Sequence, residues 1–445
     1  MPRVVRETLI SVRDLAITWG PFLIIGIALL AAAYFWLDPQ PPRHVVLGTG
    51  PENSAYAEFG KLYAAELKRH GITVELRQTA GSRENLLLLR DGRQKLDLAF
   101  VQGGASETIR TRAEEEMEPV ESLGSLFFEP VWVFYRADAI KDFAMLTQLR
   151  GKRVNIGARG SGTPGLFMRL MAANQIDREE LTRSLLSDQE AVVALLGGKL
   201  DAVVLIAAPE APFVQMLLNT PGIKLFETVH AEAYARRYRY IRPVVLPRGV
   251  AHLSLDIPSH DVQLIATTTS LVARQGIHPA LAQLFMQAAS RIHSGSGWIA
   301  RAGEFPTAAA NEFPLAKDAE RYYRNGPPLL QRYLPFWLAN VIDRMWVALF
   351  SIVVVLLPVS RMVPPLYRLR VRSKIFRWYR NLRLIEAELE ANERPREELA
   401  KSLDKLEQRV AAVSVPLAYA DELYALRSHI DLVRERLQVY SMRKS

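Results

Sequence analysis

Apolar and polar positions follow two different periods along the middle of the chain. Short apolar or alternating runs typical of strands cover residues 44–47, 73–78, 96–101, 153–156 and 201–206, and amphipathic segments of helix length cover residues 55–70, 82–90, 165–175 and 188–196. Gly71 and Gly92 follow two of these segments, as expected where a helix ends. The alternation of strand and helix predicts an α/β fold with mainly parallel sheets.

A short internal similarity suggests two lobes of similar build. DGRQKLDLAFVQG (91–103) and LGGKLDAVVLIAA (196–208) both pass from a helix end through glycine and Leu-Asp into an apolar strand. Two further apolar runs, residues 131–135 and 262–272, are expected to cross between the lobes. Because ligands of such folds bind in the cleft, we expect the site to lie between the lobes.

Residues 19–37 form a longer apolar run without a charged side chain. This length is about enough to cross ~30 Å of hydrocarbon, and Trp19, Tyr34 and Trp36 lie at its ends, as in aromatic belts. A cleaved signal peptide is the alternative, but its apolar region is usually shorter and the following Asp-Pro-Gln-Pro-Pro is a poor cleavage site. We predict a cytoplasmic N-terminus over residues 1–16 and a retained transmembrane helix over residues 17–37.

A second apolar run, residues 337–359, predicts a second transmembrane helix. It contains Asp343 and Arg344, and if the run spans the membrane these two side chains must pair or lie near a membrane interface. The alternative is a buried helix of the soluble domain. Residues 361–383 hold eight Lys or Arg and no Asp or Glu, a strong positive-inside signal. We therefore expect two spans in the inner membrane, both termini cytoplasmic, and residues 43–330 in the periplasm.

Charge and residue composition limit the classes of function that are expected for the chain. The net charge is +9, and residues 361–445, with 18 basic and 12 acidic residues, contribute +6 of it. The excess positive charge therefore belongs to the tail, where anionic membrane lipid is the expected partner. Nucleic acid is not expected as a partner. The chain has no cysteine, which fits an oxidising compartment. Its eight histidines lack the spacing of metal ligands, and no hydrolase motif occurs, so we expect no metal, no cofactor and no catalytic residue.

The basic cytoplasmic tail, residues 361–445, is predicted to be helical. Two apolar seams alternate spacings of three and four, at residues 399, 403, 406, 410, 413 and 417 and at residues 423, 426, 430, 433, 437 and 440. Pro416 separates the seams, which predicts an antiparallel helical hairpin. A coiled coil that joins copies of the chain into a homo-oligomer is the alternative use of such seams.

Three predicted strand-to-helix loops are rich in glycine and hydroxyl groups: GTGPENS (48–54), AGSREN (80–85) and GARGSGT (157–163). A strand, a glycine-rich turn and a helix form the layout that binds an anion on backbone N–H groups. GARGSGT has neither the lysine of a Walker loop nor the Gly-x-Gly-x-x-Gly spacing, so a nucleotide is not expected. Three such joints facing one cleft predict a small organic anion held by neutral donors.

Individual loop residues also have structural interpretations. Ser82 and Asn85 are alternatively helix caps, and Arg83 and Arg159 are either ion-pair partners of the ligand or surface arginines.

The segments GTGPENSAYAEFGKLYAAEL, QTAGSRENLLLLRDGRQKLDLAFVQGG and LTQLRGKRVNIGARGSGTPGLFMRLMAANQI, in this order, resemble the TAXI family. This family comprises extracytoplasmic solute receptors of tripartite ATP-independent periplasmic (TRAP) transporters. The resemblance covers roughly residues 44–300 and implies a two-lobed type II periplasmic-binding-protein fold that closes on a dicarboxylate, 2-oxo acid or acidic amino acid. It also implies integral membrane permease subunits as partners, and the two-span form looks like a membrane-tethered branch.

The resemblance carries over a set of ligand-binding residues: Thr49, Ser54, Tyr56, Ser82, Asn85, Gln102, Ser161 and Thr163. Arg83, Arg159 and Gly162 of the same loops complete the candidates. The chain departs from the family's pattern at Glu52-Asn53-Ser54, where a glycine pair usually precedes the tyrosine, at Gln102-Gly103-Gly104, which often reads Gln-Ser-Asp, and at Arg83. Glu52 would repel a carboxylate and Arg83 would attract one, which favours a ligand outside the family's common acids.

Two functions follow from these patterns. The first is a receptor that captures a small organic anion and presents it to a permease. The second is a ligand-sensing signalling or scaffold protein that relays cleft closure to its helical tail. The length of the tail favours the second, and the lack of a recognisable output domain favours the first.

Overall fold

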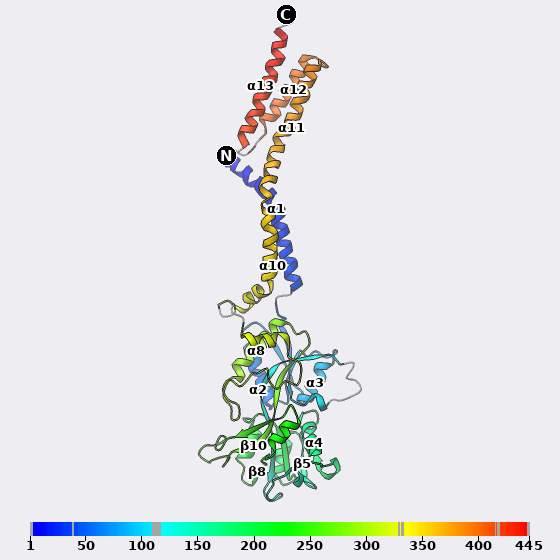
Figure 1. The fold of residues 1–445 in the computed structure, drawn as a ribbon, viewed down its shortest axis with the longest axis vertical. Coiled ribbons are helices and arrows are strands. Elements are labelled where there is room, and N and C mark those ends of the chain that lie inside the picture. Colours follow the sequence, from blue (N-terminus) through cyan, green and yellow to red (C-terminus); the bar gives the residue numbers. More distant parts are fainter. Residues whose placement is uncertain are drawn as a thin grey trace. The chain divides into compact units, whose positions relative to one another are not determined.

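The structure, a computed structural model, describes residues 3–37, 40–108, 117–327, 330, 333–413, 415 and 419–442. The chain forms two compact units, Gln40–Asn340 and a helical unit of Met1–Pro39 with Val341–Ser445, and each is described by itself (Figure 1).

The first lobe of the larger unit contains β1 (His44–Gly48), α2 (Ala55–Lys68), β2 (Thr73–Arg77), α3 (Ser82–Arg90) and β3 (Leu98–Gln102). β1 lies between β2 and β3 and is parallel to both. Tyr63 and Leu67 of α2 pack on Leu47 and Phe100 of the strands, which buries one face of the sheet.

The second lobe repeats this arrangement with β5 (Arg153–Asn155), α4 (Thr163–Ala173), β6 (Thr182–Ser184), α5 (Asp188–Leu196) and β7 (Ala202–Ile206). β5 lies between β6 and β7 and is parallel to both. The internal similarity in the sequence covers equivalent positions, since it leads into β3 in one lobe and β7 in the other. Asp97 Oδ2 accepts a hydrogen bond from Val46 N (2.7 Å), and Asp201 Oδ2 accepts one from Arg153 N (2.8 Å).

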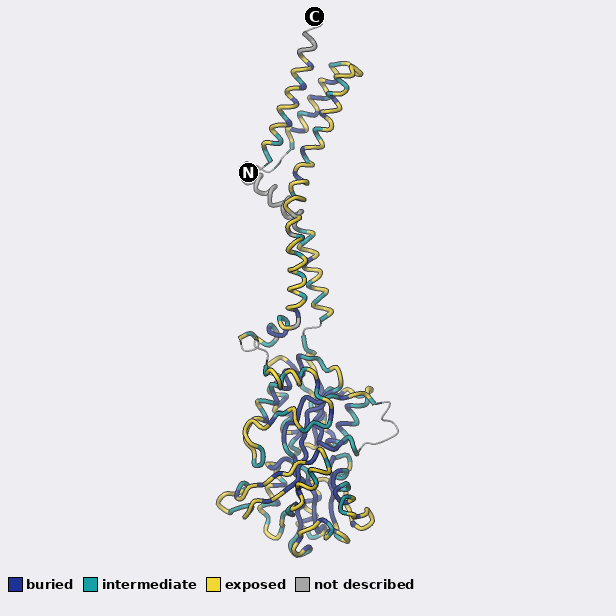
Figure 2. Tube along the Cα trace, in the orientation of Figure 1, coloured by how far each residue is buried: buried dark blue, intermediate teal, exposed yellow. Residues whose placement is uncertain are grey.

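Two long strands, β4 (Val120–Arg136) and β10 (Val262–Arg274), cross between the lobes. β10 pairs with β3 near its end and with β9 (Arg242–Leu246) near its start, and β4 pairs with β10 and then with β7. The predicted crossings are confirmed, although β4 begins earlier than expected. All pairs made by β4 and β10 are antiparallel, so the sheet is mixed rather than mainly parallel. Figure 2 shows the buried core running through this unit.

The larger unit also contains η1 (Ser106–Thr108), η3 (Leu146–Leu149), η4 (Arg178–Glu180), α6 (Pro212–Leu218), β8 (Ile223–Leu225), α7 (Ala231–Arg237), α8 (Pro279–His293) and α9 (Lys317–Asn325).

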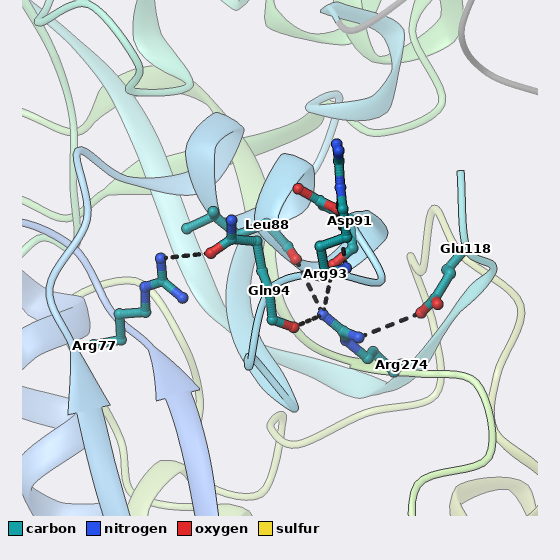
Figure 3. Close-up of polar contacts among 7 residues, drawn as sticks. All are labelled: Arg77, Leu88, Asp91, Arg93, Gln94, Glu118 and Arg274. Carbon is teal, nitrogen blue, oxygen red and sulfur yellow. Dashed lines mark hydrogen bonds and ion pairs between the residues drawn. The ribbon is translucent and has the colours of Figure 1, made fainter. Parts of the chain in front are cut away.

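Arg274, the last residue of β10, ties the loop between α3 and β3 to the crossing strands (Figure 3). Its Nη2 donates to the carbonyl oxygens of Asp91 (2.8 Å) and Gln94, and its Nη1 donates to Glu118 (3.3 Å). Arg77 Nη2 in turn donates to the Gln94 side chain (3.0 Å). These bonds hold the loop that leads into β3.

The helical unit contains α1 (Arg3–Leu37), most of α10 (Phe336–Ser360), α11 (Val363–Ala391), α12 (Arg396–Ala411) and α13 (Ala420–Met442). Gly20–Leu37, with a mean hydropathy of 2.0, is long and apolar enough to cross a membrane. Among the described residues, a second candidate arises only when Met345–Val359 is taken together with Pro364–Ala391, bent by 41°. The spans over residues 17–37 and 337–359 therefore stay predictions.

The helical tail is confirmed, and α11, α12 and α13 share one apolar core. The buried members are Ile375, Leu382, Ile385, Leu399, Leu403, Leu406, Val410, Leu426, Ile430, Val433 and Leu437. Leu399, Leu403, Leu406 and Val410 of the first seam and Leu423, Leu426, Ile430, Val433 and Leu437 of the second face this core within one copy of the chain. α11 is a third helix that the seams did not predict. Pro416 and Leu417 lie outside the described residues, and a coiled coil between copies stays a prediction.

Candidate functional site

A cavity of about 220 Å³ lies between the two lobes. Five helices begin at its wall: α2, α3 from the first lobe and α4, α5, α6 on the other side, through residues such as Ala55, Ser82, Thr163, Asp188 and Pro212. Helix N-termini carry unsatisfied N–H groups and a partial positive charge. The cavity therefore combines a small volume with a field that attracts negative charge.

The GARGSGT loop is also a place where the lobes touch. Glu84 N of α3 donates a hydrogen bond to Gly160 O at 3.3 Å. Gly160 has a φ of +93°, and a Cβ added there would lie 2.9 Å from Ala80 Cβ. Gly81, with a φ of +126°, would bring a Cβ within 3.4 Å of Ser161 Cα. Glycine is thus required here both for backbone conformation and for close approach of the lobes.

Seven of the predicted site residues line the cavity: Ser54, Tyr56, Ser82, Gln102, Ser161, Gly162 and Thr163. The serines differ in what they offer a ligand. The hydroxyls of Ser54 and Ser161 donate to carbonyl oxygens of their own loops, at 2.7 and 2.8 Å. Ser82 Oγ instead accepts a hydrogen bond from Gln102 N at 2.7 Å, which leaves its hydroxyl hydrogen available to a ligand.

Gln102 provides a second available donor. Its side chain is buried at the end of β3, and Nε2 has no hydrogen-bond partner among the residues that the structure describes. A Cβ at Gly162 would collide with Gln102 Oε1, so the glycine allows the amide to lie against the start of α4. Since buried amide donors are normally paired, the Gln102 amide in the cavity wall is a donor with which a bound ligand would pair.

Two predicted residues lie behind the wall instead. Asn85 is fully buried, and its Nδ2 donates to the carbonyl oxygens of Thr49 (2.7 Å) and Phe100 (2.9 Å). Its Oδ1 accepts from Thr79 Oγ1 (2.8 Å). The Thr49 hydroxyl donates to Arg77 O (3.2 Å). Asn85 thus connects α3 to β1 and β3, and Thr49 connects β1 to β2; neither borders the cavity.

The two predicted arginines, Arg83 and Arg159, do not border the cavity either. Both line a separate groove on the other side of Ser161.

Glu129 is a cavity residue that the sequence patterns did not predict. It lies in β4 with a side chain almost fully buried, and its Oε2 accepts hydrogen bonds from the Tyr56 hydroxyl (2.9 Å) and from Thr269 Oγ1. Burial raises the pKa of Glu129 to about 7, against the opposing effect of these two hydrogen bonds. Burial and the nearby Glu129 also raise the pKa of Tyr56, which keeps its hydroxyl protonated. A lone glutamate within the apolar run LFFEPVWVF was the available signal.

The charged side chains in the cavity wall are all acidic. Glu52, Glu129 and Asp188 line it, and no Lys, Arg or His does so among the described residues. Asp188 is accessible from the cavity, yet the surrounding protein desolvates it and raises its pKa. Among the described residues no cluster of His, Asp and Glu is arranged to hold a metal ion. Positive helix ends together with carboxyl groups suit a ligand that carries both charges.

The fold and the site define a two-lobed α/β domain that encloses a small cavity between its lobes. The chain belongs to the NMT1-like family, whose family model matches residues 47–326. The resemblance to the TAXI family stays a proposal. No curated protein sequence matches the chain.

Three of the solved structures that are similar to the chain are distant from it in sequence. A protein from Bordetella bronchiseptica RB50 is 17% identical, with a TM-score of 0.39 over 56% of this chain and 70% of that one. The alkanesulfonate-binding protein SsuA from Xanthomonas axonopodis pv. citri, bound to MOPS, is 13% identical, with a TM-score of 0.37 over 57% and 73%. The periplasmic aliphatic sulphonate binding protein SsuA from Escherichia coli is 13% identical, with a TM-score of 0.37 over 70% and 83%. With TM-scores below 0.5, these similarities do not establish what this chain binds.

Proposed function

We propose that the chain is a membrane-anchored solute receptor that binds a small organic ligand in the cavity between its lobes. The observation that carries this proposal is the Gln102 amide, a buried donor in the cavity wall without a partner among the described residues. The Ser82 hydroxyl hydrogen and the N-termini of five helices lie around the same space. A carboxylate group of the ligand would accept hydrogen bonds from these donors.

Of the three ligand classes that the TAXI resemblance implies, an acidic amino acid fits this cavity best. A dicarboxylate or a 2-oxo acid carries only negative charge and would meet three carboxyl groups, Glu52, Glu129 and Asp188, with no basic side chain in the described wall. An amino acid adds an ammonium group, which these carboxyl groups would favour.

Membrane attachment and transport partners complete the proposal. The helix Gly20–Leu37 supports an anchor in the inner membrane, with the domain of residues 43–330 in the periplasm and the basic tail in the cytoplasm near anionic lipid. Two spans cannot form a transport pathway by themselves, so integral membrane permease subunits of the TRAP type would be the partners.

The packed tail supports the alternative of a ligand-sensing signalling or scaffold protein. Its three helices bury a common apolar core, which is more structure than an anchor requires. In that function, cleft closure would act on a protein that binds the tail.

A ligand screen on the full chain in detergent micelles tests the proposal. A specific acid present at about 100 times its Kd should stabilise the protein by ~2.7 kcal/mol and raise its melting temperature. Gln102→Leu should weaken binding of that acid by ~1–3 kcal/mol, and Ser161→Ala with Thr163→Ala should weaken it by a similar amount. Gln275→Leu, an exposed position that does not line the cavity, is the matched control.

The outcomes separate the two functions. If one acid binds, and if Gln102→Leu weakens its binding while Gln275→Leu leaves it unchanged, the receptor function is supported. A screen without hits on a folded chain would favour the scaffold function, and equal affinity in the Gln102 variant would contradict the assignment of the cavity.

A further inference from the structure

A second groove, of about 740 Å³, lies on the outer side of the GARGSGT loop and shares only Ser161 with the cavity. Its charged lining is strongly basic, with one acidic residue, Asp177, against the following arginines: Arg83, Arg159, Arg169, Arg178 and Arg183. This charge is opposite in sign to that of the cavity wall. The groove is therefore a separate chemical environment.

Most of this positive charge has no counter-charge. Arg169 pairs with Glu107. The side chains of Arg83, Arg159, Arg178 and Arg183 make no hydrogen bond or ion pair in the part of the chain that the structure describes. Several other arginines of this unit are paired, as in Arg153 with Asp201 at 2.6 Å. Like charges gathered around one groove create a positive potential that attracts an anionic group.

The groove also has apolar lining. Met168 and Leu185 contribute to it, and the Leu185 side chain is exposed. A small inorganic anion would contact the guanidinium groups and leave this apolar surface uncovered. A polypeptide that carries both carboxylate and apolar side chains would cover both.

Both lobes contribute to the groove. Arg83 comes from α3 of the first lobe, whereas the other arginines come from the second lobe. The residue next to Arg83, Glu84, makes the backbone hydrogen bond to Gly160 that joins the lobes. The full set of arginines is thus assembled when the lobes are in contact.

We propose that this groove docks an acidic, partly apolar segment of a partner protein, and that it does so when the lobes are closed. Charge complementarity selects the partner, and Arg83 makes docking depend on closure. The inference goes beyond the proposed solute receptor, because it concerns a different surface and does not depend on which small molecule the cavity binds.

The test is binding of a fluorescent peptide of alternating glutamate and leucine to the full chain in detergent micelles, followed by anisotropy at low and high salt. The variant Arg159→Gln/Arg178→Gln/Arg183→Gln should lose about tenfold or more in affinity, since three charge contacts disappear. The matched control replaces three exposed arginines outside the groove that also have no partner among the described residues: Arg237→Gln/Arg239→Gln/Arg242→Gln. It should bind within about twofold of the parent chain.

Three results would overturn the proposal. Equal losses of peptide affinity in the two triple variants would show that binding depends only on the net charge of the chain. Inorganic phosphate that competes as well as the peptide would indicate a small-anion site. Tighter peptide binding after Glu114→Gln/Glu115→Gln/Glu116→Gln would mean that this acidic run of the chain itself competes for the groove, in place of a partner.

Arg83→Gln tests the dependence on closure. It should weaken peptide binding by about threefold, and by less than that in a chain whose lobes are held apart by Gly160→Ala. If the Arg83→Gln variant binds the peptide with unchanged affinity, the site lies in the second lobe alone and docking does not depend on closure of the lobes. Thermal unfolding of each variant identifies any that fails to fold, and the single variants Arg159→Gln and Arg178→Gln then replace the triple one.

Discussion

The Tyr56 hydroxyl donates a hydrogen bond of 2.9 Å to Glu129 Oε2 at the edge of the cavity. Tyr56 belongs to α2 of the first lobe, Glu129 to β4, and Thr269 of β10 donates to the same carboxyl oxygen. One buried carboxyl group therefore joins a helix that begins at the cavity to both strands that cross between the lobes. Its protonation state affects the cavity and the connection between the lobes together.

Glu129 should make the stability of the protein fall as the pH rises from about 4.5 to about 7. Burial raises the pKa of Glu129 from an ordinary 4.5 to about 7 in the folded protein. The folded protein then holds one more proton than the unfolded chain in this range, so its stability decreases with pH, by on the order of 3 kcal/mol in total. Chemical denaturation at pH 4.5 and pH 8 measures the change.

Glu129→Gln is the control for this effect, because glutamine retains an oxygen acceptor but does not titrate. The difference in stability between the parent and this variant should change with pH in favour of the variant. A difference that stays constant from pH 4.5 to pH 8 would show that Glu129 titrates at its ordinary pKa.

Asn85→Ala should destabilise the fold. The substitution removes one hydrogen bond to each of the carbonyl oxygens of Thr49 and Phe100, although Thr49 O still accepts from Thr79 Oγ1 at 2.8 Å, and it removes an acceptor from Thr79. Buried groups that lose their partners should cost about 2–4 kcal/mol in unfolding free energy. Asn53→Ala, at an exposed position, should cost less than about 0.5 kcal/mol. If Asn85→Ala has normal stability but no longer binds the ligand, Asn85 has the ligand-binding role that the family resemblance implies.

Gly160→Ala should weaken ligand binding by holding the lobes apart. The new Cβ would lie 2.9 Å from Ala80 Cβ of the other lobe, in addition to the strain of a positive φ. Gly151→Ala is the matched control, since its φ of +71° imposes similar strain and no atom lies within 4 Å of the added Cβ. We expect both variants to lose about 1 kcal/mol of stability, and only Gly160→Ala to lose affinity for the ligand.

A topology reporter fused after Ser445 should be active in the cytoplasm. The eight basic residues of 361–383 favour that side of the membrane. A periplasmic signal from the same fusion would remove the span over residues 337–359 from the proposal. A second fusion within the exposed segment after Gly249 should report the periplasm.

Local patterns were sufficient for the strands and helices that the sequence predicted in each lobe of the larger unit, but α6, α7, α8 and α9 were not predicted. The predicted helices over residues 82–90 and 188–196 match α3 and α5 in their bounds, and the predicted strands 73–78 and 153–156 match β2 and β5 to within one residue at each end. Each element is bounded by glycine, a cap or a change of period, and these signals lie within a few residues of one another. The helical tail was predicted for the same reason.

Contacts between residues far apart in the sequence could not be predicted from local patterns. Glu129 is 73 residues from Tyr56 and 140 from Thr269, so no local pattern could place it in the cavity. Arg83 and Ser82 are neighbours in sequence, but adjacent helix positions point about 100° apart, and only Ser82 reaches the cavity.

The sequence by itself determined the alternating strands and helices around the predicted loops, the glycine-rich loops at the ends of the strands and the apolar seams of the tail, because periodicity, capping and turn chemistry are local properties. Only the tertiary structure decided that Asn85 supports the wall while Gln102 faces the cavity, that the cavity wall is acidic and that the arginines gather in a separate groove. These outcomes depend on which side chains meet when β4 and β10 bring the two lobes together.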